Sequence, residues 1–220
     1  MRKPLILFGV LVAVVAVVVA LSNVGPSAAP SVSPSSAGVA DSPAPAPTML
    51  WAAPSDPMAR TVAAGLEPEV KEFLINHVHA HLDVFVDGQR IVVPAGIGID
   101  IENPGVRTFQ DPIGYGGIEG CAEPCISPLH THGEDGILHT ESEDPEPHTL
   151  GQFFDEWGVE LSETCVADRC APETPLAIYV DGQPVSGDPR AIELTDRKVI
   201  VVVSGTPPAQ IPSTADFSGA

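Results

Sequence analysis

Basic residues are scarce in this sequence, which has 10 Lys and Arg against 29 Asp and Glu and a formal net charge of −19. Nucleic acids and anionic lipids bind proteins mainly through basic side chains, so the charge balance argues against both as partners. The acidity is compatible with cations as partners. For most of the acidic residues, solubility of a secreted domain is the simpler explanation.

The motifs of several common enzyme classes are also absent. The sequence contains no Gly-x-Ser-x-Gly elbow, no phosphate-binding loop and no His-Glu-x-x-His helix. The segment "HTHGEDGILHTES" invites comparison with cupins, but neither Glu134 nor Glu141 stands at the cupin spacing after His132. No residue is marked as a nucleophile, so the sequence assigns no reaction.

Cysteine occurs only four times, as Cys121 and Cys125 in "CAEPC" and Cys165 and Cys170 in "CVADRC". Outside the cytoplasm disulfides are the expected state. Four cysteines allow three pairings, and the sequence does not choose among them, although pairing within each motif is sterically feasible. The alternative is thiolate metal ligands, as in copper-delivery proteins with a thioredoxin fold. No thioredoxin-like βαβ pattern surrounds these cysteines, so disulfides are favoured.

One long apolar run, from Pro4 to Leu21, follows Arg2 and Lys3. A helix of about 20 apolar residues spans a bilayer, and flanking positive charges stay inside. We predict a signal anchor over residues 1–24, a single pass through the cell membrane, and an extracytoplasmic domain. Cleavage of the run as a signal peptide, followed by secretion, is the alternative. No cysteine follows the run, which excludes a lipoprotein anchor.

Composition divides the rest of the chain into three parts. Residues 25–61 are rich in Pro, Ala and Ser, which predicts an extended linker. Residues 62–207 are long enough for one globular domain with its own core. The tail, residues 208–220, lacks regular periodicity, so it either lies along the domain or is loose.

The domain alternates strand and turn signals, with little helix. "VFVDGQRIVVP" and "IYVDGQPVSGDP" both read as hairpins turning at Asp-Gly, and "SPLHTHGEDGILHTES" reads as a third. A short helix is predicted between Thr149 as N-cap and Gly158, and Gly65 to His77 also has helical potential. We predict an α+β fold, mainly an antiparallel sheet of hairpins with one short packed helix. A β-grasp-like arrangement is one candidate.

Six of the seven histidines fall in two strand motifs. In "HVHAHLDVFV" the histidines occupy one face, while Val78, Ala80 and Leu82 begin an apolar face that would pack on the core. In the third hairpin the turn would bring His132 close to His139. The histidines therefore form rows beside the core pattern and do not interrupt it.

Neutral imidazole is a common ligand for copper and zinc, and ligands at i and i+2 on a strand can share one ion. We therefore predict a copper or zinc site. Its candidate ligands are His77, His79, His81, His130, His132 and His139, with Glu141 as a further ligand or a partner of a ligand. The six histidines could form one site or two, and His81 could be structural.

Three functions are compatible with this pattern. The leading one is a membrane-anchored domain that captures, buffers or delivers the ion. The second is a redox or hydrolytic metalloenzyme that keeps an open coordination position and uses Glu141 as a base. The third is an interaction domain whose histidines are polar surface or a pH switch. No protein partner is identified by the sequence.

Four segments, "HAHLDVFVDGQRIVVPAGIGID", "CISPLHTHGEDGILHTES", "HTLGQFFDEWGV" and "YVDGQPVSGDPRAIELTDRK", together resemble a family of anchored or secreted bacterial His-rich domains. The resemblance covers roughly His79 to Phe217. It implies one continuous domain whose histidine motifs belong to the family pattern. The family has no established activity, so the resemblance implies no catalytic residue.

Overall fold

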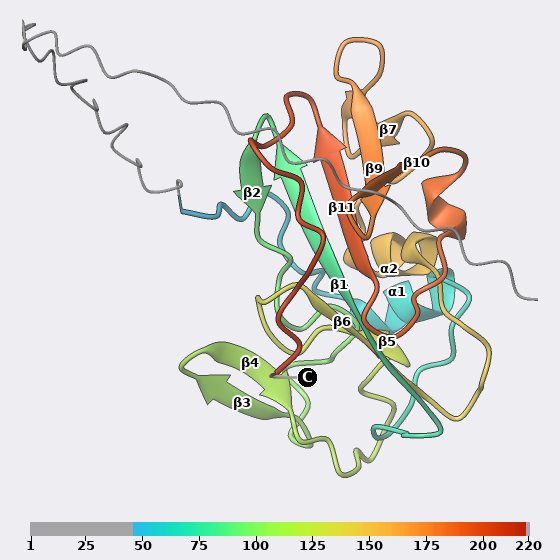
Figure 1. The fold of residues 1–220 in the computed structure, drawn as a ribbon. Coiled ribbons are helices and arrows are strands. Elements are labelled where there is room, and N and C mark those ends of the chain that lie inside the picture. Colours follow the sequence, from blue (N-terminus) through green and yellow to red (C-terminus); the bar gives the residue numbers. More distant parts are fainter. Residues whose placement is uncertain (1–45, 219–220) are drawn as a thin grey trace, which may run out of the picture. The chain divides into compact units, whose positions relative to one another are not determined.

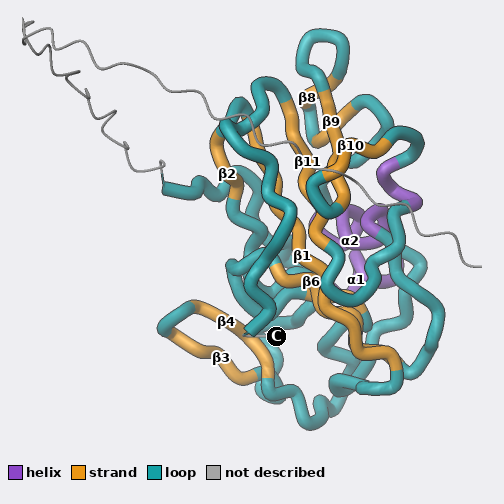
Figure 2. The backbone as a smooth tube through the Cα atoms, viewed as in Figure 1, coloured by secondary structure: helices purple, strands orange, loops and turns teal. Residues whose placement is uncertain are grey.

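The computed structural model describes residues 46–218 of the chain (Figure 1). The helical elements are α1 (Pro57–Ala63), α2 (Leu150–Trp157) and the 3-10 helix η1 (Pro189–Ala191). The strands are β1 (Asn76–Val86), β2 (Gln89–Ile91), β3 (Arg107–Gln110), β4 (Ile113–Gly116), β5 (Leu129–His130), β6 (Ile137–Ser142), β7 (Cys165–Val166), β8 (Arg169–Cys170), β9 (Leu176–Val180), β10 (Gln183–Val185) and β11 (Val199–Ser204). Loops connect these short elements and make up much of the chain (Figure 2).

The main sheet has seven strands in the order β10-β9-β11-β1-β6-β5, with β2 also paired to β1. The first half of β1 pairs with β6 and its last three residues pair with β2, so one long strand serves two hairpins. All of these pairs are antiparallel except β1 with β11, which is parallel. The predicted α+β class, with a mainly antiparallel sheet and a short helix, is confirmed.

Two matching hairpins frame the centre of this sheet. The turn between β1 and β2 has positive φ at Asp87 (49°) and Gly88 (81°), and the turn between β9 and β10 has it at Asp181 (50°) and Gly182 (76°). Positive φ at both central residues matches the twist of the flanking strands, and Asp-Gly is well suited to it. With β11 inserted between the hairpins and parallel to β1, the sheet has a β-grasp-like order.

Helix α2 covers one face of the sheet and forms the main core. Phe153, Phe154 and Trp157 are buried against alternate residues of β1, including Leu82 and Val84. Thr149 caps the helix as predicted: its Oγ1 accepts a hydrogen bond from Gln152 N, and Gln152 Oε1 accepts one from Thr149 N. Gly158 ends the helix with a φ of 74°, a conformation that favours glycine.

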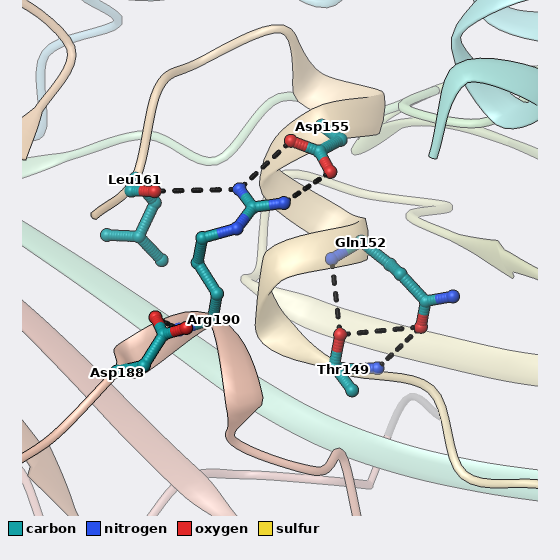
Figure 3. A network of polar contacts seen from close by, with 6 residues as sticks. All are labelled: Thr149, Gln152, Asp155, Leu161, Asp188 and Arg190. Carbon is teal, nitrogen blue, oxygen red and sulfur yellow. Dashed lines mark hydrogen bonds and ion pairs between the residues drawn. The ribbon is translucent and has the colours of Figure 1, made fainter. Parts of the chain in front are cut away.

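A polar network fastens α2 to η1 (Figure 3). The Arg190 guanidinium donates two hydrogen bonds to the Asp155 carboxylate, at 3.0 and 2.6 Å, and a third to the Leu161 carbonyl oxygen. A fork-to-fork arginine–carboxylate pair fixes orientation as well as distance. The network therefore holds the helix over the sheet from its solvent side.

The opposite face of the sheet is partly covered by the chain that follows β11, which runs back along the strands (Figure 1). Ile211, Ala215 and Phe217 pack against a second apolar cluster that includes Phe85 and Val201. Of the two alternatives for the tail, the structure supports contact with the domain surface.

The predicted helix from Gly65 to His77 is wrong. Its backbone groups pair with the segment around the first disulfide: Glu69 N donates to Ile126 O at 2.7 Å, and Cys121 N donates to Val70 O at 2.7 Å. These inter-segment bonds replace the i to i−4 bonds of a helix.

The described part of the predicted linker differs from an extended spacer. It contains α1, with Pro57 in the first turn, where a missing N–H costs nothing. Trp51 packs edge-to-face on Trp157 with ring centroids 5.8 Å apart. Trp157 Nε1 also donates a hydrogen bond to Trp51 O at 3.2 Å, so ring and backbone contacts both join this segment to the domain. Residues 1–45, which include the predicted signal anchor and most of the linker, lie outside the described residues.

The four cysteines form two local disulfides, Cys121–Cys125 and Cys165–Cys170. None of them is therefore a free thiolate ligand. The disulfides indicate an oxidising environment, extracytoplasmic or secreted. Within residues 46–218, no helix has the length and apolar character needed to cross a membrane.

Candidate metal centre

Strand register brings histidines from three strands into one row. His79 of β1 lies opposite His139 of β6, and His139 lies opposite His130 of β5. The next pair along β1 and β6 joins His77 to Glu141. Directly opposed residues on one face of a sheet are close enough for their side chains to touch. The alternation on each strand places this row on the face opposite the core packed by α2.

The inner group of the centre consists of His130, His132, His139 and Glu141. Each residue offers one ligand atom, and these atoms all lie within 4.8 Å of one another. His130 is fully buried, and only 7% of His139 and 6% of Glu141 are exposed. A buried set of three imidazoles and one carboxylate has the donor types and number of a four-coordinate zinc or copper site.

Backbone carbonyls fix the tautomers of two of these rings. His130 Nδ1 donates to Ser127 O at 2.8 Å, and His132 Nδ1 donates to Tyr115 O at 2.5 Å. In the neutral ring, Nε2 is then the unprotonated nitrogen. Such a hydrogen bond on the far nitrogen is the usual support of a metal-binding histidine.

The two unprotonated nitrogens face each other, with His130 Nε2 and His132 Nε2 3.2 Å apart. Two lone pairs at this distance repel unless a cation lies between them. Zinc–nitrogen bonds of about 2.0–2.1 Å give ligand separations of roughly 3.3–3.4 Å at the edges of a tetrahedron. The observed spacing is therefore close to what a shared ion requires. The buried His139 Nδ1 adds a nitrogen that has no hydrogen-bond partner among the described residues.

An outer group, His77, His79 and Glu141, adjoins the inner one and shares its carboxylate. His77 Nε2 lies 3.1 Å from His79 Nε2 and 3.3 Å from Glu141 Oε1. The His77 side chain is 41% exposed, so this group opens to solvent.

The environment favours the neutral form of His79, His130 and His132. Burial, followed by the nearby charges of His139 and His77, lowers the pKa of His79 to about 4. Burial also lowers the pKa of His130 and of His132, with neighbouring histidines acting in the same direction. Burial alone would raise the pKa of Glu141, but the nearby ring of His139, followed by those of His132 and His77, outweighs burial, so the pKa is lowered. Neutral imidazole and ionised carboxylate are the forms that bind metals.

Two histidines lie outside the cluster. His81 Nε2 donates to Asp135 O at 3.0 Å, and its ring packs near Phe217 with centroids 6.4 Å apart. Of the predicted ligands, His81 is thus the only one that the fold does not bring to the cluster, which fits the structural role considered for it. His148, which was not predicted as a ligand, is buried beside Thr140 Oγ1.

The β3–β4 hairpin closes over the inner group at His132. A Cβ at Gly116 would lie 3.1 Å from His132 Nδ1, so glycine lets β4 approach the ring closely. A cavity of about 470 Å³ lies between this hairpin and the histidine, and Glu72, Asp111 and Asp135 also line it. The sequence did not predict that the carbonyls of Ser127 and Tyr115 would hold these rings, because any residue type can supply a backbone carbonyl. It also did not predict the position of Glu72, which depends on how the loops pack.

Gly98 provides a test of how tightly the inner group is built. Its φ is +73°, and an added Cβ would lie 2.6 Å from Leu129 O and 3.1 Å from His130 Cβ. Gly65 has a similar φ of +77° but no atom within 4 Å of such a Cβ. Gly98→Ala is expected to lower the free energy of unfolding by about 1–3 kcal/mol more than Gly65→Ala, because only Gly98 is overpacked. Urea unfolding of both variants measures this difference; equal losses would mean that the loop can move away from His130.

No family model matches this chain, and no curated protein or solved structure matches it either. The resemblance to a bacterial His-rich family therefore stays a prediction. What the fold and site define is an α+β domain carrying histidine–glutamate clusters that could bind a metal ion.

Proposed function

We propose that this domain binds copper or zinc outside the cytoplasm, and that it captures, buffers or delivers the ion near the cell surface. One observation carries the proposal: His130 and His132 direct unprotonated nitrogens at each other across 3.2 Å, while carbonyls hold their other nitrogens. No hydrogen bond can satisfy both neutral rings at that contact, whereas a metal ion can.

Two further features support the cellular setting. The paired cysteines fit an oxidising compartment, where copper and zinc are available to imidazole ligands without competition from protein thiols. The apolar run near the N-terminus supports attachment to a membrane, with the domain on the outer side. Attachment would keep a metal-binding domain where ions enter or leave the cell.

Titration of the full chain tests the proposal. Protein purified in detergent from an oxidising compartment would be stripped with a chelator and titrated with Zn²⁺ and Cu²⁺ by calorimetry. We expect stoichiometric binding, and we expect His130→Ala/His132→Ala to lose the tightest binding event, since the variant removes two of the four inner ligands. His81→Gln, on the same face of the sheet but outside the cluster, is the control and should bind as wild type does.

Thermal unfolding of each chelated protein would show that the variants remain folded. If wild type binds neither ion, or if the double variant binds both as tightly as wild type, the proposed function is wrong.

The cavity beside His132 favours a second candidate, a metalloenzyme. A space of about 470 Å³ next to a metal ligand is large enough for a small substrate, and Glu72 on its wall could move a proton. Burial and the charge of Glu141 raise the pKa of Glu72, which suits that role. Azide added to Co²⁺-loaded protein separates the candidates. A change in the visible spectrum would reveal an open coordination position, whereas an unchanged spectrum favours a closed binding site.

A further inference from the structure

We infer that the centre holds two metal ions, an inner one and an outer one, with the Glu141 carboxylate bridging them. This inference rests on the proposed function and specifies its stoichiometry and the order in which ions enter. The inner ion would be bound by His130, His132 and His139, and the outer ion by His77 and His79.

The first argument is that the short nitrogen–nitrogen contacts form two separate pairs. His130 and His132 approach to 3.2 Å at the β5 edge, while His77 and His79 approach to 3.1 Å on β1. Both distances are near the roughly 3.3–3.4 Å edge of a tetrahedral zinc site. A single inner ion explains the first pair, whereas the contact between His77 and His79 requires either a second ion or a hydrogen bond from one ring to the other.

The second argument is the position of Glu141 between the pairs. Its Oε1 lies 3.3 Å from His77 Nε2, in the outer group, and 3.5 Å from His139 Nδ1, in the inner group. The carboxylate is 6% exposed and so is held in place by its surroundings. A carboxylate in contact with both groups is the natural bridge of a two-metal site, in which ions lie about 3.5–4 Å apart.

The third argument is ligand number. The cluster offers five imidazoles and one carboxylate, whereas tetrahedral copper and zinc sites use about four protein or solvent ligands. His79 and His139, which oppose each other with ring centroids 4.6 Å apart, lie at the junction of the groups. With the carboxylate shared, the inner ion has four protein ligands and the outer ion has three, so a tetrahedral outer ion keeps one position for solvent or substrate.

Two divalent ions beside one carboxylate need further negative charge nearby, and the fold supplies it. Glu72 lines the cavity next to His132. A carboxylate at this position lowers the repulsion between the ions.

The two sites differ in access to solvent. The His77 side chain is 41% exposed, whereas His130 is fully buried. An ion arriving from solvent therefore meets the outer group first, and Glu141 is positioned to bind it while it passes to the inner group. The outer ion should exchange quickly and the inner ion slowly, a useful combination for capture followed by storage or delivery.

Metal stoichiometry tests the inference. Full-length protein is brought to equilibrium with Zn²⁺ by dialysis, which retains a rapidly exchanging ion, and its bound metal is measured by atomic emission. We expect two equivalents for wild type and for the His81→Gln control, and one for His77→Ala/His79→Ala, because that variant leaves the inner histidines unchanged. If the double variant proves unstable, His77→Ala alone replaces it, since an exposed side chain can be removed with little effect on folding.

Cu²⁺ loading gives an independent readout. Two bridged Cu²⁺ ions should couple magnetically and lose electron paramagnetic resonance intensity, and the outer-site variant should show the full signal of an isolated ion. One equivalent in wild type, with an uncoupled signal, overturns the two-ion inference and leaves the proposed function intact. Absence of any bound metal overturns both.

Discussion

Glu141→Gln is expected to weaken zinc binding by more than about 100-fold at both sites, the largest loss of any single substitution in the centre. Replacement of a residue that only supports a metal ligand typically lowers metal affinity by about 10–100-fold. Glu141 is proposed as a ligand itself, so its replacement should cost more. Glutamine keeps the size of the side chain but removes the negative charge. The carboxylate contacts both groups, so no other single residue should affect both ions equally.

Competition with a chromophoric chelator measures this loss. Glu146→Gln is the matched control, because it removes the same charge from an exposed position on the loop after β6. The control should keep wild-type affinity if the effect of Glu141 is local. Equal weakening in both variants would instead mean that the general negative charge of the protein attracts the ions. Unchanged affinity in Glu141→Gln would mean that the Glu141 carboxylate binds neither ion.

The sequence predicts those parts of the fold that local patterns determine. Alternation in β1 placed Ala80, Leu82 and Val84 in the core and the histidines on the other face, and the Asp-Gly turns marked both hairpins. Thr149, predicted as the N-cap, marked the start of α2. In each case the signal and the structure lie within a few residues of each other.

Long-range pairing could not be predicted in this way. Nothing local shows that β11 joins β1 in parallel, or that β6 pairs with the first half of β1 and so sets His79 against His139. The predicted helix at Gly65 failed for the same reason, because its backbone partners lie near Ile126, far along the chain. The sequence therefore supplies the ligand types, and tertiary pairing decides which ligands meet.

His81 shows at a single residue what the sequence alone could not predict. By alternation it is equivalent to His77 and His79, yet its partners across the strands are Ile137 and Val199, which cannot bind a metal ion through their side chains. Its Nε2 donates to a carbonyl in the turn before β6. A histidine row on a strand is thus necessary for this centre, and the neighbouring strands determine which of its members can take part.

Acid is expected to destabilise the metal-free protein through the same histidines. The folded-state pKa of His79 is about 4, below the ordinary value of 6.5. Between these values the unfolded chain binds more protons than the folded one, so this contribution to stability is complete above pH 6.5 and is lost as the pH falls toward 4. Buried Glu69 and Glu156 act in the opposite direction, because their pKa values are raised to about 7 and about 8.

A comparison of wild type with His79→Gln isolates the histidine contribution, since the two glutamates are common to both proteins. In chelator, urea unfolding from pH 7 to pH 4.5 should show wild type losing stability relative to the variant. Parallel pH profiles would show that His79 titrates normally in the folded protein. Zinc at a thousand times the Kd of a site should add about 4.1 kcal/mol per occupied site to wild type near pH 7. That gain should shrink as protons compete for the same nitrogens, so acidification releases the ion and weakens the fold through one set of side chains.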